Sequence, residues 1–268
     1  MPPTREVTSR IELNVLAPAR LVLQVAVADG PRRHVEELEI SVDGRPAADV
    51  REIATTAGGR LHVLDVGAGP VVVAYRAVVS AAVPPAPPEP DELFSYLRPS
   101  RYSESDKLFA LAQREVAGTT PASLALAAQA WVRTRLAYVL GSSRGTDSAV
   151  DTLLAGAGVC RDYAHLLVAL LRARDVPARL VSVYAPGLDP MDFHAVVEAW
   201  LGERWCALDA TGLAPRQSLV RIATGRDAAD TAFVSTQGGG VELVATAVTA
   251  TASPGLPVDP PDSLVTLG

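Results

Sequence analysis

Cys160 stands where a cysteine can act as a nucleophile. It follows Gly158 and Val159 and begins a segment whose apolar residues recur at helical spacing up to Pro177. Thiols at helix N-termini ionise more readily than free thiols, whose pKa is ~8.5, because the helix dipole stabilises the thiolate. The glycine allows a substrate chain to approach the backbone closely. The same residues would also fit a buried, inert cysteine, so the cysteine alone does not predict an enzyme.

Two residues further along the chain could activate this thiol. His194 begins a predicted strand, and Asp209 ends the next one. A thiol nucleophile needs a base to take its proton, and the base needs a carboxylate to hold its imidazole in the right tautomer. The order Cys, His, Asp along the chain is that of papain-like thiol enzymes. The residue types therefore predict a catalytic triad of Cys160, His194 and Asp209.

The turn between these two strands decides whether His194 and Asp209 can meet. The segment 201–204, Leu-Gly-Glu-Arg, predicts a two-residue hairpin turn of type II′, because glycine occupies its first central position. That register pairs Trp200 with Trp205 and, counting outward, puts His194 and Asp209 on one face as diagonal neighbours. Their Cβ atoms are then at most ~7–8 Å apart, close enough for the imidazole to reach the carboxylate.

Two other residues are weaker candidates for chemistry. Cys206 lies in the middle of a predicted strand among apolar residues, on the face opposite Asp209, so we expect it in the core. His165 follows Cys160 by five positions, which is about 140° around a helix. We therefore interpret His165 as a packed or capping histidine and not as the base.

The elements that must position these residues fall into two parts with different periodicity. Residues 7–82 alternate apolar and polar side chains between turn signals, which predicts a small all-β sandwich over residues 1–83. Five prolines within residues 84–90 predict a stiff linker, which we place at 84–92. Helical spacing follows, and then predicted strands, so residues 93–268 are expected to form an α+β catalytic domain.

Composition narrows the classes of function. The 268 residues carry a net charge of −6 without a basic patch, so we expect no nucleic-acid partner. The sequence has no apolar run of about 18 residues and no secretory leader pattern, so we expect no membrane span. Two cysteines and four histidines predict a cytoplasmic location without disulfides or a zinc site. No acidic loop resembles a calcium site, so we expect no metal and no cofactor.

Four segments resemble the transglutaminase-like superfamily. The segment around the cysteine, residues 158–166, reads Gly-Val-Cys-Arg-Asp-Tyr-Ala-His-Leu. The others are residues 176–182, 192–198 and 205–211, which read Val-Pro-Ala-Arg-Leu-Val-Ser, Asp-Phe-His-Ala-Val-Val-Glu and Trp-Cys-Ala-Leu-Asp-Ala-Thr. The resemblance covers about residues 95–240, and the N-terminal β-module looks like the small domain that precedes this fold in many bacterial members. One departure is Ala210, where the family often has proline.

The resemblance implies a papain- and transglutaminase-like core with a defined chemistry. The thiolate of Cys160 would attack the carbonyl carbon of a peptide bond or glutamine amide, and an acyl-thioester would form as His194 protonates the leaving amine. Asp209 would orient the histidine. The backbone N–H of Cys160 would be one oxyanion donor, and a second donor is not assigned.

Three functions are open on this reasoning. Water as the acceptor makes the protein a protease or amidase, which an aqueous cytosol and the lack of an evident acceptor site favour. An amine acceptor makes it a protein-crosslinking transglutaminase. A scaffold or binding module that has lost turnover is less expected, because all three triad residues are present. The substrate would be a peptide or protein amide, and the β-sandwich offers a surface on which a partner could dock.

Overall fold

Alternation of buried and exposed side chains defines the long strands of the N-terminal module. In β1 (Thr4–Val15) and β7 (Gly69–Ser80) nearly every second residue is buried, as one-sided burial of a strand requires. The two strands pair antiparallel along their whole length. The computed structural model describes residues 3–80 and 88–267 of the chain.

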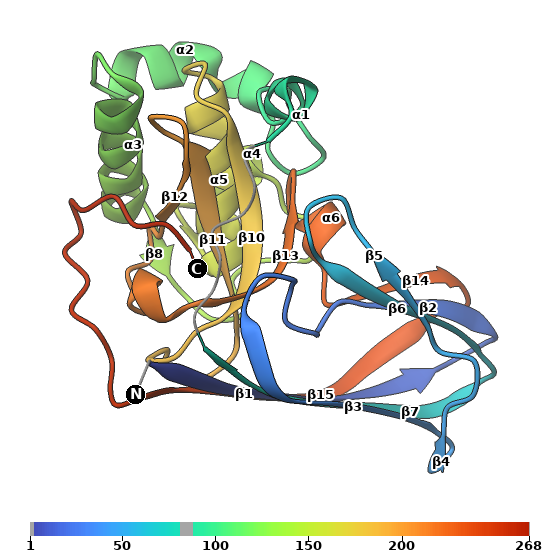
Figure 1. Cartoon of the computed structure of the whole chain (residues 1–268). Helices are drawn as coiled ribbons and strands as arrows, with labels where there is room; N and C mark the ends of the chain where they lie inside the picture. Colours follow the sequence, from blue (N-terminus) through green and yellow to red (C-terminus); the bar gives the residue numbers. More distant parts are fainter. Residues whose placement is uncertain (1–2, 81–87, 268) are drawn as a thin grey trace.

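Two antiparallel sheets share one core in this module, at the bottom of Figure 1. The first has the strand order β15-β1-β7-β3-β4 and the second β14-β2-β6-β5. Ile11, Leu21 and Val73 lie between them with no exposed surface. The predicted β-sandwich is therefore present. Its other strands are β2 (Ala19–Leu23), β3 (Arg32–Val42), β4 (Arg45–Pro46), β5 (Arg51–Ala54), β6 (Arg60–Val66), β14 (Val234–Gly238) and β15 (Val241–Ser253).

Both sheets are completed by the C-terminal part of the chain. Strand β15 pairs with β1, from Thr4 opposite Ser253 to Val15 opposite Val241, and β14 pairs with β2. Each sheet thereby covers the backbone N–H and C=O groups of a strand that would otherwise lie at an edge. The expectation that residues 93–268 form one separate domain is thus corrected, since 234–253 belong to the sandwich sheets.

The predicted linker at 84–92 is described only in part. Residues 84–87 lie outside the described residues. Helix α1 (Pro90–Ser95) begins inside the predicted linker, with proline in its first turn, where the missing N–H costs nothing.

The second part of the chain packs helices against one face of an antiparallel sheet, whose strand order is β12-β11-β10-β13. None of the helices within 3–80 and 88–267 is long and apolar enough to cross a membrane. The arrangement confirms the α+β prediction. The helices are α2 (Ser105–Glu115), α3 (Pro121–Arg135), α4 (Ala149–Ala155), α5 (Cys160–Arg172) and α6 (Ala228–Thr231), with the 3-10 turn η1 (Arg216–Ser218). The strands are β8 (Ala137–Tyr138), β9 (Ala157–Gly158), β10 (Ala178–Tyr184), β11 (Phe193–Trp200), β12 (Trp205–Leu208) and β13 (Val220–Gly225).

Helix α5 is the centre of this part. Every residue from Asp162 to Arg172 is buried, because α2, α3 and α4 pack on one side of the helix and β10 and β11 on the other (Figure 1). Only its first turn approaches the surface, where Cys160 is half-buried. The packing thus fixes the orientation of the turn that carries the thiol.

The two parts of the chain share a packed junction. Tyr184, at the end of β10, is fully buried in the core of the sandwich. Its hydroxyl donates to the carbonyl of Val25 at 2.8 Å and lies 2.9 Å from the hydroxyl of Ser9. The sheet of the second part is therefore anchored directly to the sandwich.

A buried ionic cluster fixes the same sheet near β12. Glu198 has no exposed surface and lies between Arg179 at 2.7 Å and Arg221 at 2.6 Å. Burial alone would raise the pKa of Glu198, but the two guanidinium groups lower it to about 2. Arg179 also lies over the ring of Trp205, 3.9 Å from its centroid. The cluster ties β10, β11 and β13 together.

Candidate active site

Cys160 occupies the first position of α5. The side chain of Asp162 accepts a hydrogen bond from the backbone N–H of Val159 at 2.8 Å and so caps the helix at this point. Gly158 makes that approach possible, because a Cβ there would lie 2.6 Å from the Cβ of Asp162. The sequence around Cys160 thus builds a helix start whose N–H groups lie at the thiol.

The hairpin between β11 and β12 brings His194 and Asp209 together. Trp200 pairs with Trp205, which confirms the predicted register. The imidazole Nε2 of His194 lies 3.0 Å from Oδ2 of Asp209, and both side chains are almost completely buried. The turn type was predicted wrongly: Gly202 and Glu203 both have positive φ, 57° and 66°, which is a type I′ turn.

The electrostatics of this pair favour a charged imidazole. Burial alone would lower the pKa of His194, but the charge and hydrogen bond of Asp209, with a smaller contribution from Cys160, raise it above its ordinary value. Burial would likewise raise the pKa of Asp209, and the interactions with His194 and Thr211 lower it. Because the carboxylate accepts at Nε2, that nitrogen carries a proton. Nδ1 is buried without a hydrogen-bond partner among the described residues and is the nitrogen left for the thiol.

Three residues that the sequence analysis did not single out hold Asp209 in place. Thr211 donates to Oδ1 from its backbone N–H at 2.8 Å and from its hydroxyl at 2.7 Å. Gln129 accepts from the backbone N–H of Asp209 at 2.9 Å, and Arg133 donates to its carbonyl at 2.9 Å. The Asp-x-Thr spacing, typical of a side-chain-capped turn, was a signal for Thr211. For Gln129 the signal in the sequence was its polar side chain on the otherwise apolar face of α3.

The remaining candidates lie where the sequence analysis expected them. Cys206 is fully buried in the core beneath α5. His165 is also fully buried, and its Nε2 accepts a hydrogen bond from the backbone N–H of Ala228 at 3.1 Å. Burial lowers the pKa of His165 to about 3 despite the opposing charge of Asp227. The neutral ring therefore caps the start of α6, and among the described residues no hydrogen bond joins it to His194 or Asp209.

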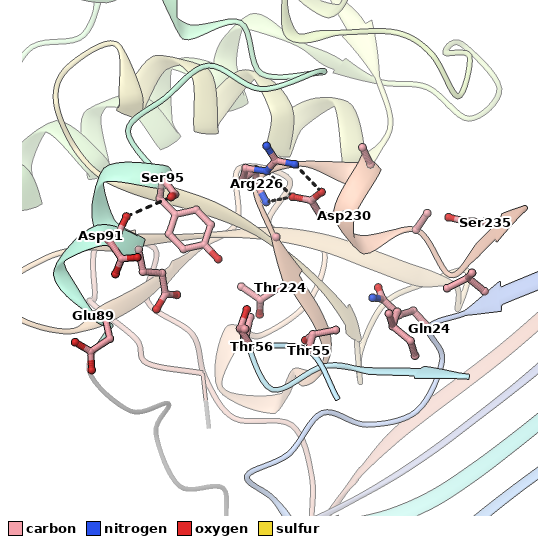
Figure 2. A pocket seen from close by; sticks show the side chains of 18 residues that line it. Gln24, Thr55, Thr56, Glu89, Asp91, Ser95, Thr224, Arg226, Asp230 and Ser235 are labelled. Atoms are coloured by element: carbon pink, nitrogen blue, oxygen red, sulfur yellow. Dashed lines mark hydrogen bonds and ion pairs between the residues drawn. The ribbon is translucent and has the colours of Figure 1, made fainter. Parts of the chain in front are cut away.

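A large hollow lies between the sandwich and helices α1 and α6. Its volume is about 860 Å³, and Figure 2 shows that polar side chains line it, among them Gln24 and the ion pair of Arg226 with Asp230. None of Cys160, His194 and Asp209 belongs to its lining. A smaller hollow of about 320 Å³ borders Asp209 on the side of Gln129 and Arg133. Size alone therefore does not locate the thiol site.

Over residues 3–80 and 88–267, no group of three or more His, Cys, Asp or Glu side chains is arranged to hold a metal ion.

A family model described as the transglutaminase-like superfamily matches residues 110–210. The crystal structure of a candidate cysteine protease from Cytophaga hutchinsonii is similar over the whole chain. It is 30% identical, with a TM-score of 0.85, and the match covers 100% of this chain and 94% of that chain. Both parts of the present chain, sandwich included, therefore have a counterpart in one solved structure.

Other relatives match smaller shares. The uncharacterized protein ML0607 of Mycobacterium leprae is 29% identical over 151 residues, which are 53% of this chain and 54% of that protein. The chain thus spans about half the length of this relative. The uncharacterized protein Rv2569c of Mycobacterium tuberculosis is 34% identical over 115 residues, 37% and 36% of the two chains. The periplasmic domain of TgpA from Pseudomonas aeruginosa is 22% identical, with a TM-score of 0.44, and the match covers 75% of this chain and 86% of that chain.

Proposed function

Because this chain belongs to the transglutaminase-like superfamily and has the fold of its cysteine protease-like members, we propose that it is a thiol acyl-transfer enzyme that hydrolyses amide or peptide bonds. In this proposal Cys160 is the nucleophile, His194 is the base and later the acid, and Asp209 orients His194. The intermediate is an acyl-thioester on Cys160.

One observation carries the proposal. The imidazole of His194 is held at 3.0 Å by a buried carboxylate, while its second nitrogen is buried and unpartnered in the described part of the chain. Cys160 lies close enough to that ring to raise the pKa of His194, an effect smaller than that of Asp209. An imidazole that is oriented on one side and free on the other can exchange a proton with a thiol.

The proposed reaction proceeds in two steps. The thiol transfers its proton to His194, and the sulfur then attacks the carbonyl carbon, forming a C–S bond and an oxyanion. The C–N bond breaks as His194 gives its proton to the leaving amine. In the second step His194 takes a proton from water and the hydroxide attacks the thioester carbon. The C–S bond then breaks, the acid leaves, and His194 returns its proton to the sulfur.

The partners and location belong to the same proposal. A peptide or protein amide is the substrate, and the β-sandwich is a surface on which a protein partner could dock. The charge of −6 argues against nucleic acid as a partner. Two free cysteines suit a reducing compartment, so we place the protein in the cytoplasm.

Turnover of a defined peptide pool tests the proposal. Wild-type protein is incubated with the pool, with and without a fluorescent primary amine. New amino termini report peptide-bond cleavage, ammonia reports glutamine hydrolysis, and peptide-bound fluorescence reports amine transfer. We expect hydrolysis products that disappear in Cys160→Ala and persist in Cys206→Ala, which serves as the matched control.

Two results would count against hydrolysis as the function. Fluorescent amine incorporated in place of hydrolysis products would assign the chain to protein crosslinking. No product of either kind from folded wild-type protein, over a pool that samples all side chains, would favour a binding module.

A further inference from the structure

The short parallel pair of β8 and β9 places Tyr138 beside the turn that carries the thiol. Tyr138 lies opposite Gly158, two residues before Cys160. Backbone hydrogen bonds fix this register on both sides: Ala137 donates to the carbonyl of Gly156 at 2.9 Å, and Val139 donates to that of Gly158 at 3.1 Å. The segment around Tyr138 is therefore attached to the strand that leads directly into the first turn of α5.

Packing directs the ring of Tyr138 along that turn. Its centroid lies 5.9 Å from that of Tyr163, which follows Cys160 by one helical turn. Tyr163 is itself fixed, because it is buried and its hydroxyl donates to the carbonyl of Leu136 at 2.8 Å. Tyr138 keeps 38% of its surface exposed. The ring thus lies beside the first turn of α5 and is still accessible to a substrate.

The hydroxyl of Tyr138 stays protonated next to the reacting groups. Burial raises the pKa of Tyr138 to about 12, and the negative charges of a Cys160 thiolate, Asp192 and Asp209 act in the same direction. The backbone N–H of Cys160 acts on this pKa in the opposite direction. The hydroxyl therefore shares its surroundings with that N–H, and it remains a donor at neutral and moderately alkaline pH.

We propose that the Tyr138 hydroxyl is the second hydrogen-bond donor to the oxyanion, beside the backbone N–H of Cys160; this rests on the acyl-transfer function proposed above. As the sulfur attacks, the carbonyl oxygen gains negative charge and needs donors that are already in place. The Cys160 N–H supplies one from the helix start, and Tyr138 supplies the other from the facing strand. Tyr138 gives up no proton in the reaction.

Two reagents separate this role from a role in activating the thiol. Acylation of Cys160 by 4-nitrophenyl acetate passes through an oxyanion, whereas alkylation by iodoacetamide displaces iodide and forms none. The Tyr138→Phe variant keeps the ring against Tyr163 and loses only the hydroxyl. We expect its pre-steady-state acylation rate to fall on the order of 100-fold, while its alkylation rate at the same pH stays within about two-fold.

Tyr102→Phe is the matched control, since it also removes a tyrosine hydroxyl, from a ring that stacks on His165 and has no hydrogen bond to Cys160 among the described residues. It should leave both rates unchanged. An unchanged acylation rate in Tyr138→Phe, or equal losses in acylation and alkylation, would overturn the assignment of Tyr138. Failure of the wild-type protein to be acylated at Cys160 would overturn the proposed function, and the role of Tyr138 with it.

Discussion

The Asp209→Asn substitution removes the negative charge that holds a proton on His194 while keeping the size of the side chain. In the wild-type protein the carboxylate raises the pKa of His194, although burial opposes this. Without the carboxylate, burial is the largest remaining effect on the pKa of His194, and it lowers that pKa. The imidazole therefore becomes neutral. The thiol then has no imidazolium beside it, so it must lose its proton to solvent.

The size of the effect follows from thiol ionisation. A thiol without an ion-pair partner has a pKa of ~8.5 and is about 1% ionised at pH 6.5, against nearly complete ionisation in a thiolate–imidazolium pair. This predicts about a 100-fold loss of thiolate. A less acidic thiol gives a more nucleophilic thiolate, and this raises the alkylation rate of the variant by up to about 10-fold. We therefore expect alkylation of Cys160 in Asp209→Asn to be about 10- to 100-fold slower at pH 6.5.

The assay is the iodoacetamide alkylation rate of Cys160 from pH 5.5 to 9.5, measured by peptide mass. The pKa of His194 is raised, so its proton is kept until the pH rises through that raised value. The wild-type rate should therefore change little between pH 6.5 and 8.5. The rate of Asp209→Asn should rise about ten-fold per pH unit from pH 6.5 to about 7.5, level off above about pH 8.5, and there reach or exceed the wild-type rate.

Asp230→Asn is the control, because this carboxylate pairs with Arg226 at the other end of the sheet. Its profile should match that of the wild type. If Asp209→Asn showed the wild-type profile with an unchanged unfolding midpoint, Asp209 would not orient His194, and the site would reduce to a pair of Cys160 and His194.

Three further outcomes are expected. Cys206 has no exposed surface, so iodoacetamide at pH 6.5 should modify it only after unfolding, and equal labelling of both cysteines in folded protein would contradict the assignment of the nucleophile. Glu198→Gln leaves two buried guanidinium groups without their carboxylate, so the free energy of unfolding, measured in urea, should fall by about 3–5 kcal/mol. The control Asp65→Asn removes a carboxylate from an exposed ion pair and should leave the urea unfolding midpoint unchanged. Acylation of Cys160 should proceed at the same rate in EDTA and in calcium chloride, and loss on chelation with rescue by calcium would reveal a metal requirement.

Local patterns predicted the elements of the site, because each depends on few neighbours. A glycine in a two-residue turn was enough to fix the register of the hairpin and to put His194 and Asp209 on one face. The turn type was wrong because it depends on Glu203, whose positive φ of 66° is unusual for a non-glycine residue and leaves no signal in the sequence. The face of a strand on which a residue lies does not depend on the turn type, so the prediction that His194 and Asp209 lie close together is confirmed.

Long-range partners could not be predicted in the same way. The alternation of β15 indicates a strand, but alternation says nothing about which strand it joins. Most residues of β15 are exposed, so its amino-acid sequence gives little indication that the strand pairs with β1. The support of Asp209 by Gln129 is equally non-local, since the two residues come from α3 and from the end of β12. Tyr138 reaches the site through a pair of strands too short to leave a pattern.

The central claim is that Cys160 carries the acyl group and that His194 makes this possible. The direct measurement is the mass of the protein after rapid acid quench of its reaction with a peptide amide pool, followed by peptide mapping. We predict an acyl adduct on Cys160 that hydroxylamine removes, as it does a thioester, and that is absent in His194→Gln at pH 7. An adduct on another residue, or peptide turnover that persists in Cys160→Ala, would contradict the account.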